Sequence, residues 1–322
     1  MTQSNVGVLL TNIGTPASPT TRNVRTYLRK FLSDPRVIEV PKFLWWPILN
    51  GIILPLRPKR SAKLYQQIWT EEGSPLLTYS QRLCAKLQAH LKIPVALGMH
   101  YSQPSISEGL KQLQTYGVHK ILVLPLFPQY SSTTTASSFD GVAHTLKKWR
   151  VLPEIRTINH YTHESAYIKA VSHTIEEAWQ TQGKPDHLVF SFHGIPAHYA
   201  AAGDPYPDLC RQTAEAIANK LVLPKNFWSL AFQSRLGARK WLTPYTDVLL
   251  KQLPKKGVNH VHVVCPGFAT DCLETLEEIR LRGKEQFESA GGQQYYYIPA
   301  LNDSDNHIQM FAEVILKRLQ HW

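Results

Sequence analysis

The chain has 322 residues, of which 43% are hydrophobic, 10% aromatic and 18% charged. This composition is typical of a globular protein and excludes the disordered, fibrous and disulfide-scaffold classes, while the length favours two domains. Lysine and arginine outnumber aspartate and glutamate by 35 to 24, so the formal net charge is +11. Residues 22–63 carry ten of the basic side chains against only Asp34 and Glu39, which places +8 of that charge in one segment. Such a segment can bind nucleic acid, an acidic membrane surface or a small anion, or it can be a solvated face.

Short runs rich in β-branched residues alternate along the chain with longer runs of helical periodicity. We expect strands at residues 6–12, 94–101, 120–126, 155–160, 187–193, 228–233, 260–265 and 294–298. We expect helices at residues 76–91, 105–114, 165–180, 208–221 and 273–288. Several strands, such as 121–124, are uninterrupted apolar runs, which is typical of a parallel sheet covered by helices on both faces. The expected fold class is therefore α/β, with a doubly wound, Rossmann-like topology.

The two halves of the chain resemble each other. The LKQL sequence at 110–113, with Gly-Val at 117–118 and valine at 123, recurs 140 residues later. Gly-Thr-Pro at 14–16 matches Gly-Ile-Pro at 194–196, but here the offset is 180, so the first half holds about 40 additional residues. This internal duplication predicts two similar domains with parallel four-stranded sheets. We place them at 1–162 and 163–304, and expect a C-terminal helix at 305–322 to pack back on the N-terminal domain.

The additional residues, at about 40–70, include the apolar segment Phe43–Leu56 inside the basic region. Its fourteen residues contain two prolines and cannot span a bilayer, which needs about 20 apolar residues. The adjacent Trp45 and Trp46 favour a hydrophobic lip that contacts an acidic membrane interface; ordinary core is the alternative.

The cysteines indicate the compartment. None of the four, Cys84, Cys210, Cys265 and Cys272, forms a CxxC pair, and the N-terminal residues lack the pattern of a signal peptide. We therefore expect a cytoplasmic protein with reduced thiols, peripheral at the inner face of the membrane if Phe43–Leu56 is a lip.

The duplication aligns Ile13 with His193 at the ends of equivalent strands. Sites in open α/β sheets lie at the carboxyl ends of strands, so topology places His193 in a functional crevice. A histidine is often structural, but this position favours a role in proton transfer or metal binding.

A second group of polar residues follows the strand at 260–265. Asp271 is expected to be a helix N-cap with Glu274 as its capping-box partner. Glu274 and Glu278 are four residues apart on one helix face, so their repulsion should raise at least one pKa. Capping and a solvated face would explain these glutamates structurally. A carboxylate pair opposite an imidazole can also hold a divalent metal or move protons.

Several other functions lack their motifs. The chain contains no GxGxxG, GxxxxGK[ST], HExxH or GxSxG sequence, which weakens dinucleotide, nucleotide, zinc-protease and hydrolase hypotheses. The hydroxyl-rich residues 128–135 suit helix capping or an anion and are not a phosphate loop. A nucleic-acid partner is not expected, because no aromatic residues interleave with a basic face along a recognisable motif.

Six motifs lie in order along almost the whole chain. The most specific surrounds His193, at 191–196 continuing into 202–206. The others lie at 10–16, 73–76, 125–131, 232–237 and 271–276. In sequence and order, these motifs resemble those of ferrochelatases. The resemblance implies two chelatase-like α/β domains with a porphyrin cleft between them.

The resemblance also implies the site residues. His193 corresponds to the family's catalytic histidine and Glu274 to its essential glutamate; these two, with Glu278 further along an acidic line, are expected to bind the metal. Arg60 is expected to pair with a propionate. The porphyrin-binding residues implied are Ile13, Phe31, Arg60, Ser74, Tyr130, Leu236, Trp241 and Phe268.

The implied reaction is insertion of ferrous iron into protoporphyrin IX, which forms protohaem and releases two protons at the end of haem biosynthesis. Ile13 stands where coproporphyrin-using relatives carry tyrosine, which favours protoporphyrin. Ser132 stands where cluster-containing members have a cysteine, and their cysteine-bearing C-terminal extension is missing, so no iron–sulfur cofactor is expected. The alternatives are a chelatase for coproporphyrin III or for a cobalt or nickel substrate, and a non-catalytic porphyrin or haem carrier. The sequence does not specify an oligomeric state.

Overall fold

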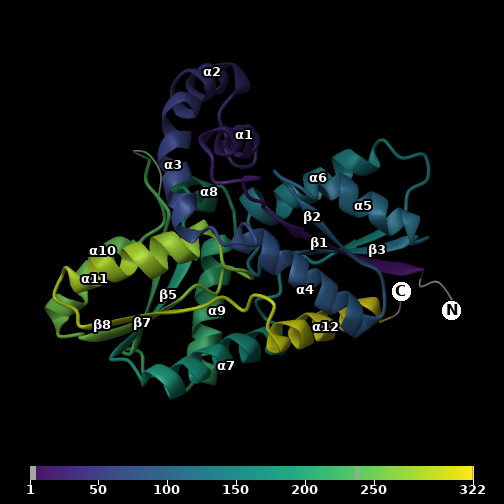
Figure 1. Cartoon of the computed structure of the whole chain (residues 1–322). Helices are drawn as coiled ribbons and strands as arrows, with labels where there is room; N and C mark the ends of the chain where they lie inside the picture. Colours follow the sequence, from purple (N-terminus) through teal and green to yellow (C-terminus); the bar gives the residue numbers. More distant parts are fainter. Residues whose placement is uncertain (1–4, 236, 238, 321) are drawn as a thin grey trace. The chain divides into compact units, whose positions relative to one another are not determined.

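The computed structural model describes residues 5–235, 237, 239–320 and 322 (Figure 1). The chain divides into two compact units. Unit 1 comprises Met1–His160 and Ile315–Trp322, and unit 2 comprises Tyr161–Val314. Helix α12 (Asp305–Leu319) begins in unit 2 and ends in unit 1.

Unit 1 is built on a parallel four-stranded sheet in the order β2-β1-β3-β4. Its strands are β1 (Val6–Asn12), β2 (Val95–Met99), β3 (Lys120–Pro125) and β4 (Glu154–Thr157). The apolar run in β3 is almost wholly inaccessible, with Ile121 and Leu124 fully buried, as expected for a strand covered on both faces. The helices of unit 1 are α1 (Thr21–Leu32), α2 (Lys42–Ile48), η1 (Leu49–Ile53), α3 (Leu54–Ile68), α4 (Pro75–Leu91), α5 (Ile106–Thr115), η2 (Ser132–Ala136) and α6 (Ser137–Leu146).

Unit 2 repeats this topology with the sheet order β6-β5-β7-β8, again entirely parallel. Its strands are β5 (His187–His193), β6 (Trp228–Gln233), β7 (His260–Val264) and β8 (Gln294–Ile298). Its helices are α7 (Ser165–Gln182), α8 (Ala197–Ala201), α9 (Tyr206–Lys220), α10 (Thr246–Gln252), η3 (Pro254–Lys256), η4 (Glu274–Gly283) and α11 (Lys284–Glu288).

The duplication extends to local detail. A parallel bridge joins Met99 to Ser105 just before α5, and an equivalent bridge joins Phe232 to Tyr245 just before α10. A π-helix follows the third strand of each unit, η2 after β3 and η4 after β7. The predicted α/β fold with two similar four-stranded sheets is therefore confirmed.

The units differ most between their first two strands. Helices α1, α2, η1, α3 and α4 connect β1 to β2, whereas α8 and α9 connect β5 to β6. Prolines occur within the helices of this connection. Pro55 lies in the first turn of α3, where no backbone donor is required, whereas Pro47 lies inside α2 and Pro58 inside α3.

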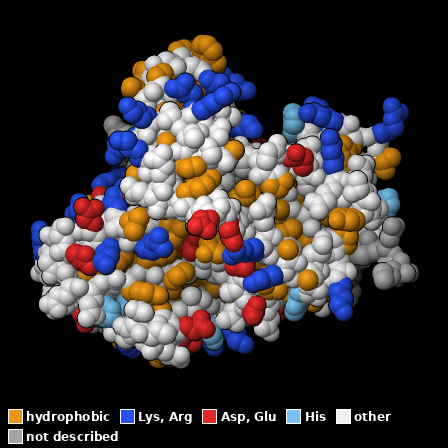
Figure 2. Space-filling view, in the orientation of Figure 1, with side chains coloured by type: hydrophobic (Ala, Val, Ile, Leu, Met, Phe, Trp, Pro, Cys, Tyr) orange, Lys and Arg blue, Asp and Glu red, His pale blue; other side chains and the backbone are white. Residues whose placement is uncertain are grey.

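The apolar segment Phe43–Leu56 spans α2, η1 and the start of α3, and most of its large side chains face outward. Phe43 is 76% exposed, Trp46 67% and Leu56 71%, whereas Leu49 and Leu54 are buried. Figure 2 shows hydrophobic side chains gathered over α2, at the top of the view, with lysine and arginine side chains directly beside and below them. No helix of the described residues is long and apolar enough to cross a bilayer.

The helix expected at 273–288 is a π-helix, not an α-helix, over much of its length. Residues Glu274–Gly283 form a π-helix, and only Lys284–Glu288 return to α-helical geometry. Hydrophobic periodicity does not separate these two geometries, and π-helical segments are frequent at functional sites.

Candidate active site

His193 is the last residue of β5, the strand that lies between β6 and β7 in unit 2. Its Nδ1 lies 2.6 Å from the carbonyl oxygen of Gly194. A carbonyl can only accept, so Nδ1 carries the proton and donates. In the neutral ring Nε2 then has a free lone pair, which can accept a proton or bind a metal. The ring of Phe268 packs at a tilt, with its centroid 6.4 Å from that of His193.

Glu274 and Glu278 both belong to η4 and lie one turn apart on the helix. Glu278 is held by the residue after β6: the Ser234 backbone N–H donates to Oε1 at 2.8 Å and the Ser234 hydroxyl donates to Oε2 at 2.5 Å. Burial raises the pKa of Glu278, and the bonds from Ser234 and the charges of Arg282 and His193 oppose this increase. The expectation of a raised pKa is therefore met, and burial is its largest cause.

Asp271 does not act as the predicted N-cap. Its Oδ1 accepts from the hydroxyls of Thr275 at 2.8 Å and Tyr297 at 2.5 Å, and its Oδ2 accepts from the Asn302 amide at 2.7 Å. Asp271 therefore ties the start of the π-helix to β8 and to the segment that follows it, while the Glu274 carboxylate accepts from the thiol of Cys272.

Trp241, another predicted site residue, also lies close to the end of β5. It forms an antiparallel bridge with Pro196, and a Cβ built on Gly194 would lie 3.3 Å from its ring. Unit 2 therefore brings Trp241 and Phe268 to the segment around His193. Leu236, the remaining predicted residue of this half, lies outside the described residues.

Three predicted residues of unit 1 are also brought together. The Ile13 carbonyl accepts from the backbone of Tyr101 at 3.1 Å, and the ring of Phe31 packs edge-on against Tyr101 at 5.3 Å. The Ser74 hydroxyl lies 2.8 Å from that of Thr15, two residues after Ile13.

The last two predicted residues of unit 1 lie on other elements. Arg60 is exposed on α3. Tyr130 is half-buried in the loop after β3, and its electrostatic partner is Arg36.

A polar network centred on Asp34 was not predicted from the sequence. Oδ2 of Asp34 accepts from the hydroxyls of Tyr101 at 2.6 Å and Ser137 at 2.5 Å, and lies 3.2 Å from Nε2 of His100. These residues lie far apart in sequence, and spacing alone gives no sign of the network. The equivalent bridges before α5 and α10 align His100 and Tyr101 with Gln233 and Ser234 of unit 2, a correspondence that only the structure reveals.

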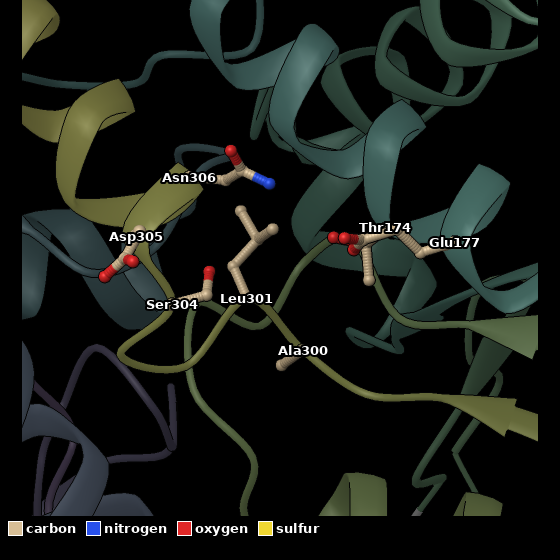
Figure 3. A pocket seen from close by; sticks show the side chains of 7 residues that line it. All are labelled: Thr174, Glu177, Ala300, Leu301, Ser304, Asp305 and Asn306. Atoms are coloured by element: carbon tan, nitrogen blue, oxygen red, sulfur yellow. The ribbon is translucent and has the colours of Figure 1, made fainter.

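A cavity of about 360 Å³ lies elsewhere in unit 2, between α7 and the start of α12 (Figure 3). Its lining is polar apart from Ala300 and Leu301. The side chain of Leu301 points into the cavity (Figure 3). None of the predicted site residues lines this cavity.

Comparison with known proteins identifies the family. The family model described as Ferrochelatase matches residues 5–319. The chain belongs to the ferrochelatase family. It is 51% identical to Ferrochelatase 1 of Shewanella oneidensis, with 98% of this chain and 96% of the relative covered. It is 48% identical to the ferrochelatase of Yersinia enterocolitica, with 99% of both chains covered. The enzyme is therefore a metal chelatase of haem biosynthesis, a ferro-lyase whose substrates are a porphyrin and iron.

Solved structures of distant chelatases share the fold. SirB from Bacillus subtilis, solved with Fe3+, gives a TM-score of 0.58 at 12% identity, with 98% of this chain and 96% of that chain covered. CbiX, described as the terminal enzyme of sirohaem biosynthesis in denitrifying bacteria, gives 0.52 at 14% identity, with coverages of 98% and 100%. At these identities the likeness concerns the fold alone.

Proposed function

We propose that the enzyme inserts ferrous iron into protoporphyrin IX. His193 and Glu274 are its proposed catalytic residues. The groups proposed to bind the iron are His193, Glu274 and Glu278. The observation that carries this proposal is the fixed tautomer of His193: Nδ1 is committed to the Gly194 carbonyl, which leaves Nε2 basic at the end of β5. The carboxylates of η4 follow the neighbouring strand, and the charges of His193 and Glu278 interact.

The chemistry requires these residue types. A free porphyrin carries two pyrrole protons, which must leave as the metal enters. An imidazole with a free lone pair can accept such a proton or bind iron, and a carboxylate can do the complementary task. An apolar surface that favours a bent macrocycle lowers the barrier, because it binds the reacting geometry better than the flat ring.

The proposed porphyrin contacts are those implied by the family motifs: Ile13, Phe31, Arg60, Ser74 and Tyr130 in unit 1, and Leu236, Trp241 and Phe268 in unit 2. Ile13, Phe31, Trp241 and Phe268 are half-buried and offer the apolar and aromatic surface that a macrocycle needs. The exposed guanidinium of Arg60 suits a propionate.

The test is anaerobic turnover followed by absorbance. Glu274→Gln is expected to lose iron insertion while its unfolding temperature stays near that of the wild type, and a folded variant with normal turnover would contradict the assignment. Comparing protoporphyrin IX with coproporphyrin III tests the choice of macrocycle: preference for coproporphyrin would overturn it.

The enzyme is proposed to work without an iron–sulfur cluster. Cys84 belongs to unit 1 and the other three cysteines belong to unit 2. Burial raises the pKa of all four thiols, to about 11 for Cys84. Burial therefore opposes the thiolate form that a cluster needs. An analysis of iron and acid-labile sulfide that finds two irons per chain would contradict this.

The enzyme is also proposed to be cytoplasmic and to bind the inner face of the membrane through Phe43–Leu56. The exposed apolar side chains of this lip, bordered by lysine and arginine, suit an interface of anionic lipids (Figure 2). The two tryptophans differ: Trp46 is exposed, whereas the Trp45 indole N–H donates to the Leu32 carbonyl at 2.6 Å and anchors α2.

Co-sedimentation with vesicles containing phosphatidylglycerol tests the lip. Trp46→Glu is expected to weaken pelleting without lowering the unfolding temperature, because the Trp46 side chain is largely exposed in the folded state. Val222→Glu, a change at an 87% exposed residue of unit 2, is the control and is expected to pellet like the wild type. Equal pelleting of Trp46→Glu and the wild type would remove the lip from the proposal.

A further inference from the structure

Ser234, directly after β6, has an unusual backbone conformation. Its φ of +66° lies in the left-handed region, which is unfavourable for a residue that carries a side chain. Contacts made in that conformation must offset its cost, and strained residues of this kind cluster at functional sites.

The contacts are two hydrogen bonds to a single carboxylate. The backbone N–H of Ser234 donates to Oε1 of Glu278 at 2.8 Å, and its hydroxyl donates to Oε2 at 2.5 Å. Each carboxylate oxygen is thus held by a separate donor, which fixes the plane and direction of the group. Each oxygen keeps a lone pair for another partner, such as a cation.

The neighbouring residue fixes the backbone of the same helix. Gln233 is buried, and its Nε2 donates at 2.8 Å to the carbonyl of Glu274. Its Oε1 accepts from the Ser191 hydroxyl at 2.7 Å, so the orientation of the amide is determined. Gln233 is paired with His193 in the β5–β6 register. Two consecutive residues therefore set the position of η4 relative to the end of β5.

We propose that Ser234 is a positioning residue for iron, which holds the carboxylate of Glu278 in the orientation that the metal meets. The inference rests on the proposed role of Glu278 as an iron-binding group. It goes beyond that role by assigning the left-handed turn after β6 to the orientation of this carboxylate.

Ser234→Gly separates this function from a merely structural one. Glycine adopts a φ of +66° without cost and keeps the backbone N–H bond, so this variant loses the hydroxyl bond alone. We expect KM for ferrous iron to rise about tenfold, the effect of losing one hydrogen bond to a charged group. The KM for porphyrin is expected to be unchanged. The unfolding temperature is expected to be equal to that of the wild type or higher.

Ser234→Ala and Ser229→Ala complete the set. Ser234→Ala also lacks the hydroxyl but keeps the backbone cost, so it is expected to show the same iron KM as Ser234→Gly with a lower unfolding temperature. Ser229 is half-buried on the same strand, with its hydroxyl 2.9 Å from Nε2 of His187. Ser229→Ala is therefore a matched control for the loss of a serine hydroxyl and is expected to keep wild-type KM values.

The outcomes distinguish the inference from the proposed function. Wild-type iron KM in Ser234→Gly, or equal increases in the KM values for iron and porphyrin, would overturn the positioning role. Glu278→Gln is measured alongside. If it raises iron KM while Ser234→Gly does not, Glu278 keeps its role and only the positioning inference is lost. If it leaves iron KM unchanged, the proposed role of Glu278 is wrong, and the inference falls with it.

Discussion

Asp34 provides a quantitative test of the network in unit 1. Its Oδ2 accepts from Ser137 at 2.5 Å and Tyr101 at 2.6 Å and lies 3.2 Å from His100, while its Oδ1 accepts from the Arg36 backbone at 2.7 Å. Burial by itself would raise the pKa of Asp34, but hydrogen bonds from His100, Ser137 and Tyr101 hold it well below its usual range. The network joins the segment after α1 to the end of β2 and the start of α6.

Asp34→Asn keeps the shape of the side chain and removes its charge. The side chain is 11% exposed, so solvent screens these bonds only weakly. A hydrogen bond to a charged group stabilises a protein by about 1.5–3 kcal/mol and a neutral one by about 1 kcal/mol, and the weakening of several such bonds gives an expected loss of ~2–3 kcal/mol at pH 7. For a unit of this size the unfolding temperature should fall by roughly 5–10 °C.

The contribution of Asp34 to the free energy of unfolding depends on pH, and its sign follows from the direction of the pKa shift. Because the native pKa of Asp34 is depressed, its stabilisation is fully present above the unfolded pKa of about 3.9 and is lost as pH falls through the native pKa. The difference between wild type and Asp34→Asn should therefore be constant from pH 8 to 5 and shrink below about pH 4.

Thermal unfolding followed by circular dichroism at pH 7, 5, 4 and 3 measures this difference. Asp140→Asn is the matched control. It breaks the 2.7 Å ion pair between Asp140 and Arg36, whose side chains are 50% and 42% exposed. The free energy of unfolding is expected to fall by only about 0–1 kcal/mol. Equal unfolding temperatures for Asp34→Asn and wild type at pH 7, or a difference that grows below pH 4, would refute the reasoning.

Three further predictions concern unit 2 and the thiols. His193→Ala is expected to abolish iron insertion with an unchanged far-ultraviolet spectrum, and turnover near the wild-type rate in the folded variant would contradict its role. Glu278→Gln is expected to raise the unfolding temperature more at pH 8 than at pH 4. The pKa of Glu278 is raised in the folded protein, so its stabilising protonated form is lost as pH rises. An unfolding temperature below that of the wild type at pH 8 would count against a buried charge. Burial raises the pKa of every thiol, so iodoacetamide at pH 8 should leave the cysteines of the folded protein largely unmodified. In urea it should label all four, which mass spectrometry can measure. Rapid labelling of Cys210, Cys265 or Cys272 in the folded protein would disprove their burial.

Much of the fold was predictable from local patterns. Strands β1, β5, β6 and β8 have the predicted ends, because each is a short apolar run bounded by turn residues. The position of His193 also followed from sequence, since the duplication and the rule that sites lie at the carboxyl ends of strands depend only on the order of elements.

Other features could not be predicted because they depend on contacts between distant segments. The sequence pattern at Asp271 fits an N-cap, but its carboxylate accepts from Thr275, Tyr297 and Asn302, two of which lie on or after β8. The raised pKa of Glu278 was expected from a neighbouring charge, whereas its main cause is burial, which no spacing reveals.

The sequence by itself determined the fold class, the internal duplication, the family and the identity of the candidate residues, because these depend on periodicity, order and motif. Tertiary structure alone decided that η4 is a π-helix, that Ser234 holds Glu278 by both donors, and that Trp46 is exposed while Trp45 is anchored. It also decided that Asp34 is the centre of a polar network. The physical reason is the same in each case: burial and hydrogen bonding are set by segments that are remote in the chain and become neighbours only when the sheet and its helices pack together.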